Sequence, residues 1–577
     1  MREPPTFVAR WLSTAGRAAL ALALVECGSL AWRIAAARTP WIMASVFLAS
    51  AAAVWVLALP LAAGACVRPV RATWVRMAIA GVGVAIALVA FRIDAGAYVR
   101  LYGAYHGALG FVSVLGVTVA CAMLPSQRRW VPSLAAGGFT LVAGFAAMQL
   151  RHDARAFAAQ RGVLLADAFW ATHAYARSLP AMPRHASALD APVAPAPTRP
   201  QLILLLTIDA LRADIARAPA LNALAAIREN SVSFTGARAP AAWTVPSAYA
   251  MLTSRGPWSV QWTRTQFYGD RPLPYSGTDD NPRRVWPLPM RDRAPTLPEA
   301  LRAAGYETRV CTTLPFQVPR GGLVRGFDVV EQGVYHRRNL DLRGVTSDML
   351  TGCGLAMIQA ARGRPLFLWL HYSDPHEPYA SHPEAPARDD TPLARYAGEV
   401  AFVNRHLAAL LLNVDRMVGL GRTLVVLTAD HGEEFGEHGG EFHAVTLYDE
   451  IARVPLMIAM PGFPSRAVGG NVSLLDVAPT ILDLVGAPPL PRAEGRSLAR
   501  AMRGEPLASR RVFGESIRYG RAVRMVVDGD FKLIYEARAR TYELFNLRND
   551  PGEQRNIADQ RRDVLTRLAA AMGVPAP

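Results

Sequence analysis

Apolar residues follow two different patterns along the chain. Before residue 150 they form long runs, each close to the length of about 20 residues that an apolar helix needs to cross a bilayer. Beyond residue 200 they form short runs that alternate with helical stretches, as the buried strands of a parallel sheet do. The pattern predicts an α-helical transmembrane bundle followed by an α/β domain with a central, mostly parallel sheet. The long runs lie near residues 18–35, 41–65, 73–91, 104–124 and 130–150.

The flanks of the long runs indicate about five membrane spans over residues 1–150. Trp41, Trp74 and Trp130 stand at run edges, where indole rings favour the interface between lipid and water. The alternative for all five runs is a buried helical bundle. The first run contains Glu26 and lies between two close arginines, so a cleaved signal segment with a small-residue exit at residues 35–37 is an alternative to a first span.

The arginines near the long runs predict the orientation of the protein. Cytoplasmic loops are richer in Lys and Arg than loops on the other side of a membrane. With the N-terminus inside, most of these arginines fall on inner segments, so residues 151–577 are predicted to lie outside the cytoplasm. We expect an integral protein of a bacterial inner membrane whose catalytic domain is periplasmic. The inner set is Arg2, Arg10, Arg17, Arg68, Arg71, Arg76, Arg128 and Arg129, and the outer set is Arg33, Arg38, Arg92 and Arg100.

Composition changes this picture little. The formal net charge of +16 is the excess of 62 basic over 46 acidic residues; Lys532 is the only lysine, and the arginines are scattered along the chain. No nucleic-acid-binding motif accompanies the charge, so we expect no nucleic-acid partner. The Pro/Ala-rich stretch 178–200 is predicted to be an extended linker. Of the five cysteines, Cys311 and Cys353 could form one disulfide, and their spacing leaves this open.

Three of the short apolar runs end in acids and imidazoles. In an α/β sheet the ligand lies beyond the carboxyl ends of parallel strands, so these three runs are expected to deliver their polar side chains to one edge. The alternative, that these side chains belong to ordinary solvated loops, would have to hold three times. Run 201–209 ends at Asp209, run 365–379 leads into His371, Asp374 and His376, and run 422–443 leads into Asp430, His431, His438 and His443.

Thr244 lies in the segment AAWTVPSAYAMLTSR, residues 241–255. A threonine before a proline is a common helix start, so its hydroxyl could be a cap alone. Asp209, Asp430 and His431 would form a ligand set suited to Zn²⁺ or Mn²⁺. A metal and a helix N-terminus both help to ionise a hydroxyl, which favours a nucleophilic role for Thr244, and the helix end can hold a tetrahedral anion.

An ordered series of motifs spans residues 203–560. It resembles the sulfatase branch of the alkaline phosphatase superfamily. The resemblance implies that Asp209, Thr244, Asp430 and His431 bind the metal. It also implies a sulfatase-like catalytic domain at 201–505 and a smaller C-terminal subdomain at 506–577, behind a juxtamembrane helix and linker at 151–200. The motifs are TIDALRAD, AAWTVPSAYAMLTSR, TLPEALRAAGYET, LHYSDPHEPY, TADHGEEFGEHG, LYDEIARVPLMIAMPG, LLDVAPTILDLVGAPPLP and FKLIYEARARTYELFNLRNDPGEQRN.

The histidines that follow the second and third runs extend the predicted site. His376 and His443 fall where relatives place imidazoles that contact the phosphoryl or sulfuryl group or a second metal. Together with Thr244 they form the predicted catalytic set. A second metal or the substrate could be held by residues chosen from Asp374, His376, His438 and His443.

The chain departs from the family pattern at two positions. Sulfatases that use formylglycine place Cys or Ser where Thr244 stands, followed by an arginine where Ala248 stands. They also usually carry a second Asp where Ala210 stands. No formylglycine is therefore expected, and the loss of a hard carboxylate beside His431 favours Zn²⁺ or Mn²⁺ over Ca²⁺. In its architecture, with a threonine nucleophile, several spans and an external catalytic domain, the predicted protein is similar to the lipoteichoic acid synthases and the phosphoethanolamine transferases.

These features predict a membrane-anchored, metal-dependent hydrolase or transferase. It would act on phosphate or sulfate esters through a threonine nucleophile, with transfer of a phospholipid head group as one candidate reaction. Two alternatives remain open. The first is a plain sulfuric ester hydrolase. The second is a catalytically inactive, membrane-tethered binding module, which would hold no metal and turn over no ester.

Overall fold

The computed structural model describes most of the chain beyond residue 198. The described residues are 182, 199–268, 271–274, 286–335, 346–382, 389, 391–518, 521–537 and 539–575, and all belong to one compact unit. The predicted membrane spans, the juxtamembrane helix and nearly all of the predicted linker lie outside them. Within the described ranges, none of the helices combines the length and the apolar character that a bilayer crossing requires.

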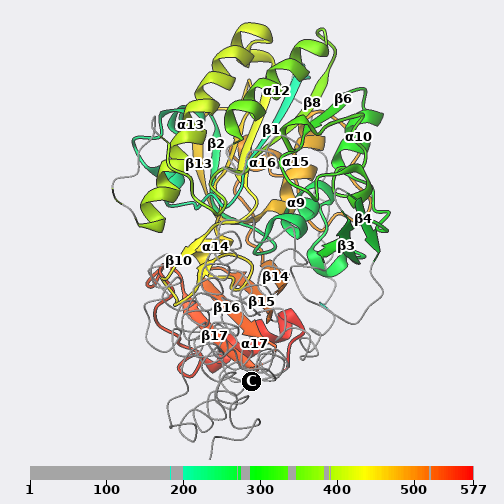
Figure 1. Cartoon of the computed structure of the whole chain (residues 1–577). Helices are drawn as coiled ribbons and strands as arrows, with labels where there is room; N and C mark the ends of the chain where they lie inside the picture. Colours follow the sequence, from blue (N-terminus) through cyan, green and yellow to red (C-terminus); the bar gives the residue numbers. More distant parts are fainter. Residues whose placement is uncertain are drawn as a thin grey trace, which may run out of the picture. The chain divides into compact units, whose positions relative to one another are not determined.

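An eight-stranded sheet forms the centre of the described region, in the order β13-β2-β12-β9-β1-β8-β6-β7 (Figure 1). β1 lies between β8 and β9 and is parallel to both. Only β12 among these eight strands runs antiparallel to its neighbours, so the predicted mostly parallel sheet is confirmed. The strands are β1 (Leu202–Ile208), β2 (Val232–Arg238), β6 (Glu307–Cys311), β7 (Val329–Glu331), β8 (Leu366–Tyr372), β9 (Thr423–Ala429), β12 (Leu456–Ala459) and β13 (Arg466–Ser473).

The three central strands β1, β8 and β9 are the three apolar runs that the sequence singled out. Every residue of each strand is buried, because helices cover both faces of the sheet and leave no solvated side. Continuous apolar runs are the sequences that such strands require. The three strands therefore end beside one another, and the residues that follow them meet at one edge.

Helices pack in two groups on the sheet, one formed by α8, α12 and α13 and the other by α9, α10 and α15 (Figure 1). The longest, α13, buries Tyr396, Val400, Val403 and Leu407, whose spacing of three and four residues gives one apolar stripe. The helices of this region are α8 (Asn222–Glu229), α9 (Thr244–Thr253), α10 (Leu297–Ala303), α12 (Ser347–Ala360), α13 (Pro392–Met417), α14 (Asp449–Ala452), α15 (Val477–Leu484) and α16 (Ala499–Met502).

A second sheet of four antiparallel strands follows in the order β14-β15-β16-β17, and α17 packs on β15 and β16. The boundary predicted at residue 505 lies between α16 and β14. The elements of this C-terminal region are β14 (Val512–Arg518), β15 (Arg521–Asp528), β16 (Phe531–Glu536), β17 (Thr541–Asn546) and α17 (Arg562–Met572).

Smaller elements fill the connections. β3, β4 and β5 form a three-stranded sheet between α9 and α10, and β10 pairs with β11 after β9. They are β3 (Thr263–Tyr268), β4 (Arg271–Pro274), β5 (Trp286–Leu288), β10 (Glu434–Phe435) and β11 (Glu441–Phe442), with the 3-10 helices η2 (Ile215–Arg217), η3 (Pro257–Ser259), η4 (Pro319–Gly321), η5 (Leu420–Arg422) and η6 (Leu474–Asp476).

A disulfide joins the end of β6 to α12. It links Cys311 to Cys353, whose Cα atoms are 6.4 Å apart. The spacing of the cysteines had left this pairing open.

Candidate active site

Four predicted metal-binding residues come together where β1 and β9 end and α9 begins: Asp209, Thr244, Asp430 and His431. Ile208 of β1 pairs with Ala429 of β9, so Asp209 and Asp430 leave the sheet side by side. The N–H of Ala210, a residue in the left-handed conformation, donates to Asp430 Oδ1 over 3.3 Å. The loop after β2 delivers Thr244 as the first residue of α9.

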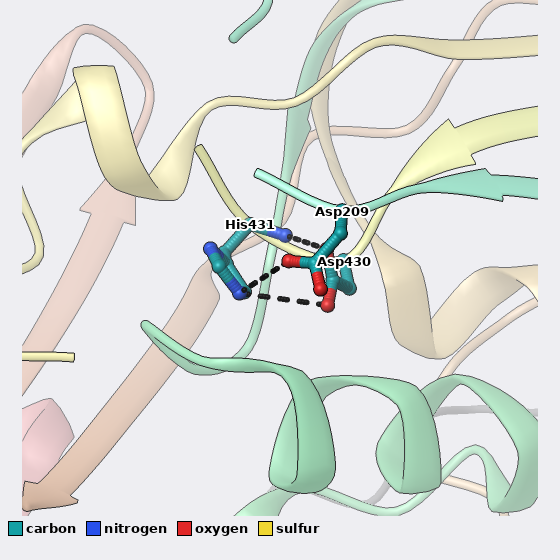
Figure 2. A group of neighbouring side chains, drawn as sticks. All are labelled: Asp209, Asp430 and His431. Atoms are coloured by element: carbon teal, nitrogen blue, oxygen red, sulfur yellow. Dashed lines mark hydrogen bonds and ion pairs between the residues drawn. The ribbon is translucent and has the colours of Figure 1, made fainter. Parts of the chain in front are cut away.

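Asp209, Asp430 and His431 turn their side chains toward one point (Figure 2). His431 Nε2 lies 3.3 Å from Asp209 Oδ1 and 3.5 Å from Asp430 Oδ2. All three side chains are buried, and among the described residues neither of these two oxygens accepts a hydrogen bond. An unsatisfied buried carboxylate oxygen is unfavourable, so two of them facing one imidazole nitrogen call for a cation.

The separations fit a metal ion. Ligands about 2.1 Å from a tetrahedral Zn²⁺ lie roughly 3.4 Å from one another. The distances from Nε2 to the two orphan oxygens match this value. The imidazole is also correctly turned, because His431 Nδ1 lies 2.9 Å from the carbonyl of Gly432 and donates its proton there, leaving the lone pair on Nε2. The donor set and its geometry therefore fit a divalent cation.

The pKa values of the two carboxyl groups move in opposite directions. Burial raises the pKa of Asp430, and the charge of neighbouring Asp209 raises it further. Burial would also raise the pKa of Asp209, but the charge of His376 and the hydrogen bond from His371 outweigh it and hold that pKa far below its usual range. Two carboxylates this close repel each other, and a bound divalent cation would relieve that repulsion.

Thr244 is held at the edge of this group. Its Oγ1 lies 3.3 Å from His431 Nε2, and its side chain is buried. The N-cap of α9 is Trp243, whose side chain makes no capping hydrogen bond, so Thr244 is the first helical residue. Ser247, one turn on, donates to the carbonyl of Asp430 over 2.6 Å and ties α9 to the end of β9. The hydroxyl therefore lies between the ligand group and the positive end of a helix.

His376 and His443 lie next to this group. Their ring centroids are 4.8 Å apart, and the His443 ring is 4.3 Å from that of His431. His443 Nδ1 lies 2.8 Å from Glu433 Oε1, and Glu433 Oε2 accepts from the hydroxyl of Tyr379 over 3.1 Å. A buried carboxylate thus orients His443. Sequence reasoning missed Glu433, although it lies three residues after Asp430.

Asp374 is engaged elsewhere. Its Oδ1 accepts from the N–H and the hydroxyl of Thr346, over 2.7 and 2.6 Å, and its Oδ2 accepts from the N–H of Ser347 over 2.8 Å. These donors lie at the start of α12, so the Asp374 carboxylate accepts from amides that have no partner within the helix.

His438 belongs to a second group, with Glu434 and Glu450. The nitrogen and oxygen atoms of these three side chains lie within 4.8 Å of one another, close enough to hold an ion. His438 contacts the Glu450 carboxylate through Nδ1, and its Nε2 lies 3.1 Å from the carbonyl of Glu553. The hydrogen bond to Glu450 raises the pKa of His438 to about 9, against the opposing effect of burial. The imidazole of His438 is thus committed to a carboxylate partner.

A mostly parallel α/β sheet carries two carboxylates, an imidazole and a helix-terminal hydroxyl at its carboxyl edge. The chain with this arrangement belongs to the alkaline phosphatase superfamily. Within it, the chain belongs to the sulfatase family. The family model described as Sulfatase matches residues 201–487. A second model, described as the C-terminal part of N-sulphoglucosamine sulphohydrolase, matches residues 436–572. The resemblance inferred from the motifs is confirmed.

Individual relatives agree with this assignment. The uncharacterized sulfatase YidJ of Escherichia coli is 33% identical over 156 residues, which cover 26% of this chain and 31% of YidJ. Arylsulfatase K of Danio rerio is 34% identical over 191 residues, or 30% of this chain and 36% of that protein. The matched part thus spans about a third of the length of these relatives.

Solved structures share the fold. A putative sulfatase from Bacteroides thetaiotaomicron has a TM-score of 0.52 and 18% identity, and the match covers 65% of this chain and 92% of that one. A phosphonate monoester hydrolase from Silicibacter pomeroyi has a TM-score of 0.51 and 23% identity, over 64% and 94% of the two chains. At these identities the likeness defines the fold alone.

Proposed function

We propose that the protein is a membrane-anchored, metal-dependent hydrolase or transferase that cleaves phosphate esters through attack by the Thr244 hydroxyl. The observation that carries the proposal is the position of Thr244 Oγ1, 3.3 Å from His431 Nε2 at the first residue of α9. The nucleophile would thus adjoin both the predicted metal ligands and an anion-binding helix end.

Asp209, Asp430, His431 and Thr244 would hold the cation. Bound there, Zn²⁺ or Mn²⁺ would supply a Lewis acid that favours the ionised hydroxyl and offsets charge on the ester. Two carboxylates and an imidazole suit these ions better than Ca²⁺, which prefers more oxygen ligands. Formylglycine has no place in this proposal, because oxidation of a threonine gives a ketone rather than the aldehyde that sulfatases hydrate.

The reaction would run in two displacements. The ionised Thr244 oxygen attacks phosphorus, the bond from phosphorus to the leaving oxygen breaks, and an imidazole gives that oxygen a proton. His443 suits this role because Glu433 holds its Nδ1, and His376 is the second candidate. In the second displacement water or an acceptor alcohol attacks the phospho-threonine and returns a proton to the same imidazole, and Thr244 leaves.

Phosphorus suits this site better than sulfur. A sulfatase with an aldehyde hydrate expels sulfate by collapse of a hemiacetal, which requires no second attack at sulfur. Thr244 offers no such route, whereas a phospho-threonine is an ordinary covalent intermediate that water or an alcohol can open. A phospholipid head group is a candidate substrate because the predicted anchor would place the site near a membrane rich in phosphodiesters.

We expect the metal-loaded full-length protein to cleave a p-nitrophenyl phosphodiester with a kcat/KM at least about a hundredfold above that for p-nitrophenyl sulfate, or roughly 2.7 kcal/mol in transition-state preference. Equal or faster cleavage of the sulfate would favour the second candidate, a sulfuric ester hydrolase. The names of the sulfatase relatives support that candidate. Protein that holds no metal and turns over neither ester would favour an inactive binding module.

A further inference from the structure

Four buried side chains form a connected set beneath the site, on the paired strands β1 and β8. Thr207 of β1 pairs with His371 of β8 in the parallel register. Trp369, two residues before His371, lies on the same face of β8, because side chains alternate along a strand. Asp209 follows β1 directly. All four side chains are fully buried.

Hydrogen bonds join the four in one order. Trp369 Nε1 lies 2.9 Å from Thr207 Oγ1, Thr207 Oγ1 lies 2.7 Å from His371 Nδ1, and His371 Nε2 lies 3.4 Å from Asp209 Oδ2. An indole N–H can only donate, so Thr207 Oγ1 accepts from Trp369. Of the two atoms that contact Thr207 Oγ1, only His371 Nδ1 can accept, so we assign the hydroxyl proton to that contact. The proton of a neutral His371 is then on Nε2, where it donates to Asp209 Oδ2.

The direction of this chain of bonds matters for the ligand group. With Oδ2 of Asp209 held by His371, Oδ1 is the oxygen that faces His431 Nε2 and has no hydrogen-bond donor among the described residues. A carboxylate held through one oxygen cannot rotate freely, so its other oxygen is presented in a fixed direction. Interactions of this kind orient metal ligands and raise metal affinity in other proteins.

We propose that Trp369, Thr207 and His371 form a hydrogen-bond relay that fixes the Nε2–H tautomer of His371 and thereby presents Asp209 Oδ1 to a divalent cation. The inference rests on the proposed metal site. His371 is a positioning residue that acts through Asp209. Polar groups at these buried sheet positions are costly to desolvate, and apolar side chains would pack there without that cost, which is why a role in the site explains them better than packing does.

The relay is tested by removing one hydroxyl at a time from the full-length protein. Thr207→Val keeps the shape of the side chain but removes the donor to His371, whereas Thr207→Ser keeps the hydroxyl. Thr428 supplies a matched control: it pairs with Thr207 across β1 and β9, is fully buried, and donates to the carbonyl of Pro455 over 2.7 Å. Thr428→Val therefore also removes a buried hydroxyl, without touching the relay.

Two readouts separate the relay from a general loss of stability. Selective ¹⁵N-histidine labelling reports the tautomer of His371, assigned by its absence from a His371→Asn variant, without any metal or substrate. Competition with a chromophoric chelator measures the dissociation constant for Zn²⁺. We expect Nε2–H in the wild type and in Thr207→Ser, a mixture of tautomers in Thr207→Val, and Zn²⁺ binding weakened about tenfold in Thr207→Val and roughly ten- to a hundredfold in His371→Asn. Thr428→Val should keep both the tautomer and the affinity.

The outcomes are distinguishable from those that test the proposed function. Wild-type protein that shows the Nε2–H tautomer but binds neither Zn²⁺ nor Mn²⁺ would contradict the proposed metal site and, with it, the purpose of the relay. Wild-type protein that binds Zn²⁺ while Thr207→Val binds it equally well would overturn the relay alone. A protonated or Nδ1–H His371 in the wild type would also overturn it.

Discussion

Single residues decide the chemistry of the site because the imidazoles of His431 and His443 are each fixed through Nδ1. His431 donates a hydrogen bond from Nδ1 to the carbonyl of Gly432 and turns Nε2 toward Asp209. Glu433 forms a hydrogen bond with Nδ1 of His443. An imidazole anchored in this way presents its second nitrogen in one direction, which a metal ligand or a general acid requires. The orphan oxygens of Asp209 and Asp430 complete the group.

The ligand assignment is tested at this scale. Asp430→Ala or His431→Ala should reduce bound Zn²⁺ or Mn²⁺ by well over tenfold at a fixed free metal concentration, because each removes a direct donor. Metal content measured by mass spectrometry on purified protein gives the result. His382→Gln is the control, since it alters a buried imidazole that pairs with Glu399. Undiminished metal in either alanine variant would remove that residue from the ligand group.

At the scale of elements, the loop after β8 is tied to α13. His382 Nε2 lies 2.6 Å from Glu399 Oε2, the N–H of Ala380 donates to the other oxygen, and the His382 ring stacks on Phe402 at 3.9 Å. The same loop carries His376. Glu399 thus anchors the far end of a segment that contributes to the site.

Glu399 makes stability depend on pH. Burial raises its pKa to about 7, although the hydrogen bond from His382 opposes the shift. A carboxyl group whose folded pKa lies above its unfolded value stabilises the fold at low pH, and that contribution is lost as pH rises from about 4.5 to about 7. Glu399→Gln mimics the neutral acid, so it should match the wild type at pH 4.5 and exceed its free energy of unfolding at pH 8 by about 1–3 kcal/mol. Denaturation at both pH values measures this, and a constant difference would contradict it.

The sequence predicted the elements whose physics is local. Continuous apolar runs are typical of buried parallel strands, so β1, β8 and β9 and the acids at their ends could be predicted. β12, with four residues, could not, because the partners of a short strand depend on the whole sheet. The hydrogen bonds from the start of α12 to Asp374 could not be predicted either, because Thr346 and Asp374 are separated in sequence by all of α12 and β8. The hydrogen bond between His443 and Glu433 could not be predicted, because the acidic residues of the loop between them look in sequence like ordinary solvated ones.

At the scale of the whole molecule, the four-stranded C-terminal sheet is joined to the central region by buried charge. Lys532 of β16, the only lysine in the chain, is fully buried and lies 2.7 Å from Asp449 of α14 and 2.9 Å from Glu553. Arg238 at the end of β2 pairs with the same aspartate over 2.8 Å. Removing one partner of such a buried network leaves an uncompensated charge, so the two regions are expected to unfold together.

The proposed topology concerns residues outside the described ranges. If residues 1–150 anchor the chain with the N-terminus inside, a reporter fused after residue 200 lies in the periplasm. A phosphatase that is active only in the periplasm should then be active, and a fluorescent protein that fluoresces only in the cytoplasm should stay dark. A fusion truncated after residue 70, within the predicted cytoplasmic loop, is the control with the opposite result. Fluorescence after residue 200 without phosphatase activity would contradict the proposed orientation.

Covalent trapping on Thr244 distinguishes a nucleophilic hydroxyl from one that only supports the helix or the metal. The metal-loaded full-length protein is quenched in acid during turnover of a p-nitrophenyl phosphodiester, and its peptides are analysed by mass spectrometry. Because only the bond to p-nitrophenolate breaks, we expect Thr244 to carry the phosphoryl group with its remaining ester substituent. A Thr244→Ala variant should keep most of its metal through Asp209, Asp430 and His431 but lose turnover and the adduct. Thr244→Ala with near wild-type turnover, or an adduct on another residue, would contradict the nucleophilic role of Thr244.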